Sequence, residues 1–124
     1  MFAPRFDYHK ANSIPEAMQL LGANDEAKLI AGGHSLIPLL KLRLARTTSL
    51  IDIAGIPDLK RITVNNGTVH IGALATHWDI ASSHDVKDAC PMLAEVANGI
   101  GDPQVRNRGT IGGNVVHSDP ASDW

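Results

Sequence analysis

Two pairs of adjacent glycines constrain what this chain can fold into more than any other feature. Gly32-Gly33 follows a short apolar stretch at residues 28–31, and Gly112-Gly113 lies near the other end of the 124-residue sequence. Because glycine has no Cβ atom, such a pair lets the backbone turn sharply and lets another group approach it closely. N–H groups exposed at such a turn can bind an anion. Each pair therefore marks a turn that serves either tight packing or a ligand.

The first pair belongs to the sequence Ala-Gly-Gly-His-Ser at residues 31–35. It joins a predicted strand at residues 28–31 to a predicted helix at residues 36–42. The N–H groups of this turn would point to one spot, where the helix dipole adds a positive potential that suits a phosphate. An equally simple interpretation is a tight strand-to-helix turn in which Ser35 only caps the helix. The residues alone leave both interpretations open.

The second pair belongs to the sequence Gly-Thr-Ile-Gly-Gly-Asn at residues 109–114. Residues 98–114 are rich in Gly, Asn and Arg, which predicts a loop. Successive N–H groups in this loop would form an anion-binding nest, and the side chains of Thr110 and Asn114 can bond phosphate oxygens. Arg106 and Arg108 either raise the local potential for an anion or are ordinary exposed loop arginines, which is the commoner case. An ordinary glycine turn is the alternative for this loop taken alone. A pyrophosphate needs donors from two sides, so the two loops together favour a site in which both converge on one diphosphate.

The rest of the first half predicts a small β-α-β unit at residues 1–56. Residues 5–10 predict an edge strand, and residues 49–53 predict another strand. Ser13 and Glu16 have the spacing of a capping box for a helix that ends at Gly22. The side chains expected on the buried stripe of that helix are Ala17, Met18, Leu20 and Leu21.

The second half, residues 57–124, predicts a separate unit that begins after Gly-Ile-Pro at residues 55–57. Asn66-Gly67 lies between two alternating runs, which is a strong signal for a β-hairpin. Two helices are predicted beyond it. The first covers residues 76–83 with Thr76 as its cap, and the second covers residues 86–97 with an interruption at Pro91. We also expect exposed apolar surface on residues 68–97, through which the chain would self-associate.

Composition and motifs exclude several classes of function. The net charge of −2 offers no basic surface for nucleic acid, and the longest apolar run is too broken to span a membrane. Cys90 is the single cysteine, which fits a cytoplasmic setting. The dinucleotide fingerprint fails because Gln104 stands where its third glycine belongs, and neither glycine pair is followed by the Lys-Ser/Thr of a P-loop. The six histidines show no metal-ligand spacing.

The two glycine motifs together resemble the FAD-binding subunit of molybdenum hydroxylases, the family that includes carbon monoxide dehydrogenase medium subunits and the FAD domain of xanthine dehydrogenase. Further similarity runs through Phe-Asp-Tyr at residues 6–8, Leu-Ile-Asp-Ile at residues 50–53, Gly-Ala-Leu with Thr-His at residues 72–77, and Val-Arg-Asn-Arg-Gly at residues 105–109. The resemblance covers essentially the whole chain. It implies an α+β fold of the vanillyl-alcohol-oxidase (PCMH) type with two FAD-binding subdomains, the second of them incomplete.

The resemblance also implies which residues contact FAD. The first FAD loop would run from Leu29 to Leu36, the second would run from Thr110 to Asn114, and Ile100 and Asp123 would add an apolar and an acidic contact. The full set is Leu29, Ile30, Ala31, Gly32, Gly33, His34, Ser35, Leu36, Ile100, Thr110, Ile111, Gly112, Gly113, Asn114 and Asp123.

By the same resemblance, the flavin would take electrons from two [2Fe–2S] clusters on an iron–sulfur small subunit. A molybdopterin large subunit would feed those clusters, and an external acceptor would reoxidise the flavin. Family members continue well past residue 123, so this chain resembles a truncated product or fragment that binds FAD weakly or not at all. The alternatives are a non-catalytic fragment that binds a partner subunit without FAD, and a flavoenzyme of the same fold from another pathway, such as a peptidoglycan-precursor reductase.

Overall fold

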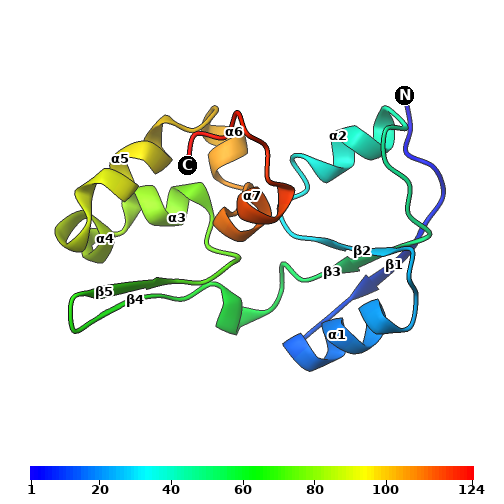
Figure 1. Ribbon diagram of the computed structural model, residues 1–124, viewed down its shortest axis with the longest axis horizontal. Coiled ribbons are helices and arrows are strands. Elements are labelled where there is room, and N and C mark those ends of the chain that lie inside the picture. The colour runs from blue at the N-terminus through cyan, green and yellow to red at the C-terminus, as the bar shows by residue number, and fades with distance from the viewer. The chain divides into compact units, whose positions relative to one another are not determined.

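The computed structural model describes all residues from 1 to 124 and divides the chain into two compact units (Figure 1). The first unit is Met1–Ile56 and the second is Pro57–Trp124. Both combine helices and strands, and we describe each by itself.

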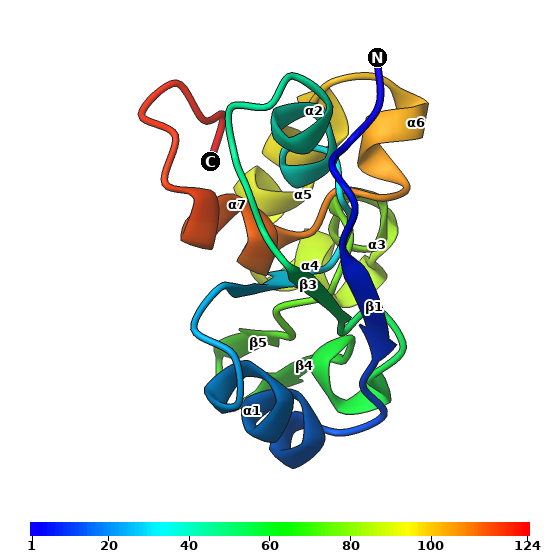
Figure 2. The ribbon, with the colours of Figure 1, turned by 90° about the vertical axis from the view of Figure 1, so that its right-hand side faces the viewer.

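The first unit is a three-stranded parallel sheet with two helices. Its elements are β1 (Asp7–Lys10), α1 (Ile14–Gly22), β2 (Ala27–Ile30), α2 (Leu36–Lys41) and β3 (Ser49–Asp52). The strand order is β1-β3-β2, so the last strand lies in the centre and pairs with both others. The chain crosses the sheet in one direction through α1 and returns through α2. Right-handed crossovers in opposite directions place their helices on opposite faces, as Figures 1 and 2 show.

The central strand β3 forms the core of the first unit. Ser49, Leu50 and Ile51 are buried, because a central strand of a parallel sheet is covered on both faces and paired on both edges. Leu40 of α2 and Ala17 of α1 are also buried. The edge strands are far more open, and every residue of β1 is exposed.

Helix α1 begins at the predicted cap but buries less than its sequence pattern indicates. The Ser13 hydroxyl accepts from the Glu16 N–H at 3.2 Å, while the Glu16 carboxylate accepts from the N–H of Asn12, one residue before the cap. The predicted buried stripe is wrong for Met18 and Leu21, which are 68% and 38% exposed. The helix has only nine residues, so it meets the small sheet along a narrow line near Ala17.

The second unit places a β-hairpin beside a group of short helices (Figure 1). Its elements are the 3₁₀ turn η1 (Pro57–Leu59), β4 (Ile62–Asn65), β5 (Thr68–Ile71), α3 (His77–Ser82), α4 (His84–Ala89), α5 (Pro91–Gly99), α6 (Pro103–Arg106) and α7 (Ile111–His117). The hairpin turns at Asn66-Gly67 as predicted, with φ of 50° and 76° at the two residues. Two successive positive φ values are those of a type I′ turn, which matches the twist of the strands.

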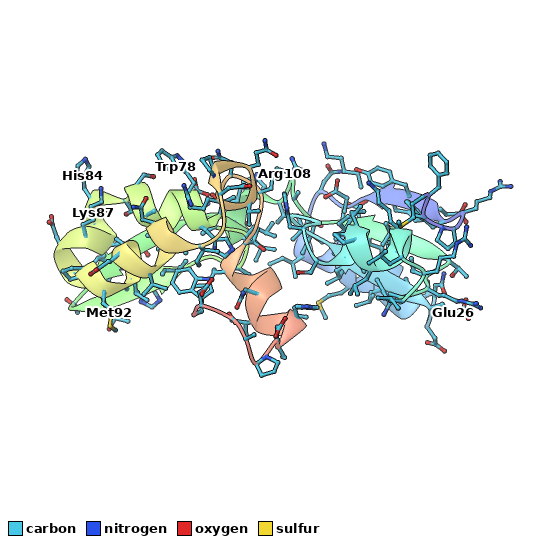
Figure 3. All side chains as sticks on the ribbon, turned by 90° about the horizontal axis from the view of Figure 1, so that it is seen from above. Glu26, Trp78, His84, Lys87, Met92 and Arg108 are labelled. Atoms are coloured by element: carbon cyan, nitrogen blue, oxygen red, sulfur yellow. The ribbon has the colours of Figure 1, made fainter.

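The core of the second unit is aliphatic and lies between α3, α4 and α5. Ile80 and Val86 are fully buried, and alanines of α5 allow the helices to approach closely. The hairpin adds partly buried Ile62, Val69 and Ile71 to this cluster. Within residues 68–97 only two large hydrophobic side chains are exposed, Trp78 and Met92, so the apolar surface predicted there is limited. Figure 3 shows both projecting away from the ribbon.

The prediction of a continuous loop at residues 98–114 is wrong. Asp102 caps α6 by accepting from the Val105 N–H at 2.9 Å, with Pro103 as the first helical residue. Thr110 caps α7 by accepting from the Gly113 N–H at 3.1 Å. The glycine-rich composition favours a loop, but the sequence also contains two ordinary signals for the start of a helix. These are the Asp102 cap followed by Pro103 for α6 and the Thr110 cap for α7. None of the helices is both long and apolar enough to cross a membrane.

The capping box of α3 gives a test of this unit. The Thr76 hydroxyl accepts from the Asp79 N–H at 3.1 Å, and the Asp79 carboxylate accepts from the Thr76 N–H at 2.9 Å. We expect Thr76→Val, which keeps the shape but loses the acceptor, to lower the free energy of unfolding by about 1 kcal/mol. Thr76→Ser keeps the oxygen and should stay within about 0.5 kcal/mol of the parent. Urea unfolding measures both, and equal losses would contradict the capping role.

Candidate functional site

The first glycine segment, residues 31–35, leaves its backbone donors free. It connects β2 to α2, and its carbonyls accept two backbone bonds from the helix: the Ile37 N–H donates to Gly33 at 3.0 Å and the Leu39 N–H donates to Ser35 at 3.2 Å. The N–H groups of the four residues that follow Ala31 donate to no group of the chain; these are Gly32, Gly33, His34 and Ser35. Unsatisfied N–H groups in succession are a binding site for an anion such as a phosphate.

Gly33 gives this turn its shape. Its φ of +79° lies in the left-handed region, which a side chain strains. A Cβ atom there would also lie 3.2 Å from Cγ1 of Ile37. The flanking Ile30 and Ala31 are half-buried, whereas His34 and Ser35 are exposed. Glycine at this position therefore sets the backbone conformation of the turn.

The interpretation of Ser35 as a helix cap is wrong. Ser35 occupies the cap position of α2, but its φ of −99° and ψ of −48° are helical, and its hydroxyl makes no capping bond. The hydroxyl is therefore available to a ligand beside the free N–H groups. Because α2 has only six residues, these donors rather than a large helix dipole provide the attraction.

The second glycine segment, residues 110–114, uses its backbone donors inside the chain. The Ile111 N–H donates to the Ala75 carbonyl at 3.1 Å and the Gly112 N–H donates to the Ala73 carbonyl at 2.8 Å. The N–H groups of the next two residues donate to the Thr110 hydroxyl and carbonyl, both at 3.1 Å. The prediction that this segment forms a nest of free N–H groups is therefore wrong. It is the first turn of α7.

Gly112 is required by close packing rather than by a ligand. A Cβ atom there would lie 2.6 Å from the carbonyl oxygen of Ala73 and 2.7 Å from its Cβ, which no backbone tolerates. A bridge between Thr76 and Thr110 continues this antiparallel contact. The sequence motif at residues 72–77 and the motif at residues 110–114 are thus one hydrogen-bonded unit.

Some donors of the second segment remain available. Thr110 is buried, yet its own N–H donates to no group of the chain. The Asn114 side chain accepts from the Ser122 hydroxyl at 2.7 Å through Oδ1, which leaves its amide N–H groups free. A phosphate thus fits the first segment through backbone donors, while the second offers one N–H group and a side-chain amide.

Ile100 is buried at the end of α5, and Arg106 holds the backbone around it. Nη1 of Arg106 donates to the carbonyls of Ile100 and Gly101 at 3.2 and 2.8 Å. The Nε–H of Arg106 is buried and has no acceptor in the chain. Arg106 therefore mainly stabilises the backbone of residues 100 and 101. Arg108 is exposed and projects from the ribbon in Figure 3.

Asp123 is exposed at the edge of a shallow depression in the second unit, whose other lining residues are Met92, Glu95, Val96 and Gly99. A carboxylate repels a phosphate but accepts hydrogen bonds from hydroxyl and ring N–H groups. Asp123 is therefore suited to the neutral parts of a ligand. No three His, Cys, Asp or Glu side chains come together in a way that would hold a metal ion.

His77 is a buried residue next to the second glycine segment that is not among the predicted FAD contacts. Its side chain is only 4% exposed, and Nδ1 accepts from the indole N–H of Trp124 at 3.3 Å. The two rings lie 5.7 Å apart at an angle of 39°. A Cβ atom on Gly109 would lie 2.9 Å from the His77 ring. The Thr-His pair at residues 76–77 was the available signal, but its partners are distant in sequence.

The comparisons with known proteins show the family of this chain. The family described as the FAD binding domain in molybdopterin dehydrogenase matches residues 4–124. The carbon monoxide dehydrogenase medium chain of Hydrogenophaga pseudoflava is 52% identical over 99% of this chain and 43% of its own length. The crystal structure of carbon monoxide dehydrogenase from Hydrogenophaga pseudoflava that lacks the Mo-pyranopterin moiety has a TM-score of 0.94 and 53% identity over 97% of this chain and 42% of that chain.

Quinoline 2-oxidoreductase from Pseudomonas putida 86 has a TM-score of 0.93 and 36% identity over 96% of this chain and 42% of that chain. The chain thus spans less than half the length of the relatives that it matches. It belongs to the FAD-binding domain family of molybdopterin dehydrogenases. The predicted family, α+β fold and FAD cofactor are confirmed.

Burial of His77 has a consequence for stability. Burial lowers the pKa of His77 below its ordinary value of 6.5. As the pH falls, the unfolded chain takes up this proton first. The free energy of unfolding should therefore be at its full value above about pH 6.5 and should fall as the pH drops through the folded pKa, by up to about 1.4 kcal/mol per pH unit. Urea unfolding between pH 7.5 and 4.5 measures this slope.

Two variants assign the slope to its residue. His77→Leu should flatten it, because the titrating group is gone. His84→Gln should not, because His84 is exposed and projects outward from α4 (Figure 3). An unchanged slope in H77L would show that other groups cause it.

Proposed function

We propose that this chain is the FAD-binding part of an electron-transfer subunit of a molybdenum hydroxylase. The observation that carries the proposal is the row of free N–H groups at residues 32–35, in a chain whose family binds FAD. When bound, the flavin supplies the redox chemistry by accepting electrons and passing them on. Held by these residues, FAD would serve to carry electrons between [2Fe–2S] clusters of a small subunit and an external acceptor.

The first glycine segment binds the pyrophosphate of FAD in this proposal. The free N–H groups of Gly32 to Ser35 donate to its oxygens, and the free Ser35 hydroxyl adds a further donor. The contacting residues are Leu29, Ile30, Ala31, Gly32, Gly33, His34, Ser35 and Leu36.

The second unit contributes through side chains more than through backbone. Thr110 and Asn114 offer the N–H group and amide that the chain leaves free, and Gly113 is exposed. The half-buried Ile111 and the buried Ile100 provide apolar contact for the flavin ring system. Asp123 accepts from hydroxyl or ring N–H groups. Gly112 acts indirectly, because it allows α7 to pack on Ala73.

In this proposal, another subunit determines the substrate of the complex. Relatives that are 52%, 44% and 43% identical to this chain are named after carbon monoxide, 6-hydroxypseudooxynicotine and glyceraldehyde dehydrogenases. Similar sequences thus serve enzymes with chemically different substrates. We infer that a molybdopterin-containing large subunit oxidises the substrate and that this chain serves as an electron carrier.

Gly33→Ala tests the pyrophosphate site, and Gly67→Ala is its matched control. Both glycines have nearly the same φ, +79° and +76°, so both substitutions impose a similar conformational strain, and at Gly33 the new Cβ atom also lies 3.2 Å from Cγ1 of Ile37. We expect each to destabilise the protein by about 1 kcal/mol. Only G33A should weaken FAD binding, by about tenfold or more, because the strained turn can no longer direct its N–H groups at one phosphate.

The measurement is an FAD titration of the full-length gene product, followed by flavin fluorescence. Gly67 lies at the tip of the β4–β5 hairpin with no atom near its would-be Cβ. If G33A and G67A bind FAD with the same Kd as the parent, the assignment of this turn to the pyrophosphate is wrong.

We further propose that these 124 residues alone bind FAD only weakly. Without the cofactor, they would serve as a fragment that binds a partner subunit. The free donors of the second segment are few, because four of its N–H groups are used inside the chain. A titration of the isolated 124-residue chain should give a Kd above about 1 μM, which corresponds to about 8 kcal/mol of binding free energy. Submicromolar binding would contradict this proposal.

A further inference from the structure

We propose that His77 is a positioning residue for FAD, which holds both ends of residues 109–124 through Gly109 and Trp124. The inference rests on the proposed function, because that stretch carries all the contacts assigned to the cofactor in the second unit except Ile100. His77 itself is buried and needs no contact with FAD.

The contacts of His77 reach the segment at two points far apart in sequence. At its start, the backbone N–H of His77 donates to the Gly109 carbonyl at 3.0 Å, and the His77 ring lies so close to Gly109 that a Cβ atom there would come within 2.9 Å of Cδ2 and Nε2. At its end, the indole N–H of Trp124 donates to Nδ1 at 3.3 Å. His77 thus contacts two residues 15 positions apart: its backbone bonds to Gly109 and its ring packs there, and the same ring accepts from Trp124.

The chemistry of the pair fixes the protonation of the ring. An indole N–H can only donate, so Nδ1 must carry no proton, and the neutral imidazole carries its proton on Nε2. A buried neutral imidazole meets this requirement. Neither a leucine nor a protonated histidine could accept from Trp124.

Trp124 transmits this restraint to the proposed cofactor contacts. It is the neighbour of Asp123, and its backbone N–H donates to the Ser122 hydroxyl at 3.3 Å. That hydroxyl in turn donates to Oδ1 of Asn114 at 2.7 Å. A short chain of bonds therefore runs from His77 through Trp124 and Ser122 to Asn114. Loss of its first bond should loosen Asp123 and Asn114 together.

The test is an FAD titration of the full-length gene product in five variants, with the thermal stability of each apoprotein measured in parallel. His77→Leu removes the acceptor, and Trp124→Phe removes the donor while keeping an aromatic ring. His77→Asn restores an acceptor, because its amide oxygen can take the place of Nδ1. The H77L/W124F double variant closes a mutant cycle. Trp78→Phe is the control, since Trp78 is the neighbouring residue but is 50% exposed.

We expect H77L and W124F each to raise the Kd for FAD by about three- to tenfold, the range expected for the loss of one hydrogen bond. The double variant should be no weaker than the weaker single variant, because both remove the same interaction. H77N should regain most of the affinity, and W78F should match the parent.

Two results separate the possible failures. If W78F and the parent bind FAD but H77L and W124F bind it equally well, this inference is overturned and the proposed function stands. If the parent itself binds no FAD, the proposed function is overturned and the inference falls with it. Additive losses in the double variant, or H77N as weak as H77L, would also overturn the inference, because the bond to Trp124 would then not be the cause.

Discussion

A backbone N–H group removed from water needs an acceptor, either within its own chain or in a ligand. The two glycine segments meet this constraint in opposite ways. The second uses its N–H groups inside the chain, whereas the first leaves them free, and this difference determines where backbone donors are available to a ligand. The second segment lies against residues 73–76, whose carbonyls and capping contacts take up its donors. The first segment follows β2, an edge strand, and no neighbouring strand lies beyond it to supply carbonyls. Its donors therefore remain for an anion.

The glycines themselves have different functions for the same reason. Gly33 is needed for its backbone conformation, while Gly112 is needed because the Ala73 backbone lies against it. Two motifs that look alike in the sequence are thus a turn with free N–H groups and a packing contact. In the second case the packing contact sets where the side chains around the glycines lie.

Much of the local structure could be predicted because its signals are local. The Asn66-Gly67 hairpin, the Ser13 and Thr76 caps and the restart of the helix at Pro91 each depend on residues within a few positions of one another. Helices α6 and α7 were missed although Asp102-Pro103 and Thr110 mark their beginnings. The high glycine content predicts a loop in spite of these caps, because a glycine-rich segment forms a helix only where tertiary contacts offset its low helix propensity. The exposure of Met18 on α1 depends on the size of the sheet, which no local pattern contains.

The sequence by itself determined that this chain has two glycine turns, an aliphatic core and the motifs of an FAD-binding family. It also determined which residues flank those turns, because turns and caps arise from short-range sterics and hydrogen bonds. Only the tertiary structure decided which turn keeps its N–H groups free, because that depends on whether another segment supplies carbonyls. The same holds for His77. The role proposed for it rests on burial and on a contact with a residue 47 positions away, and such pairings are set by packing.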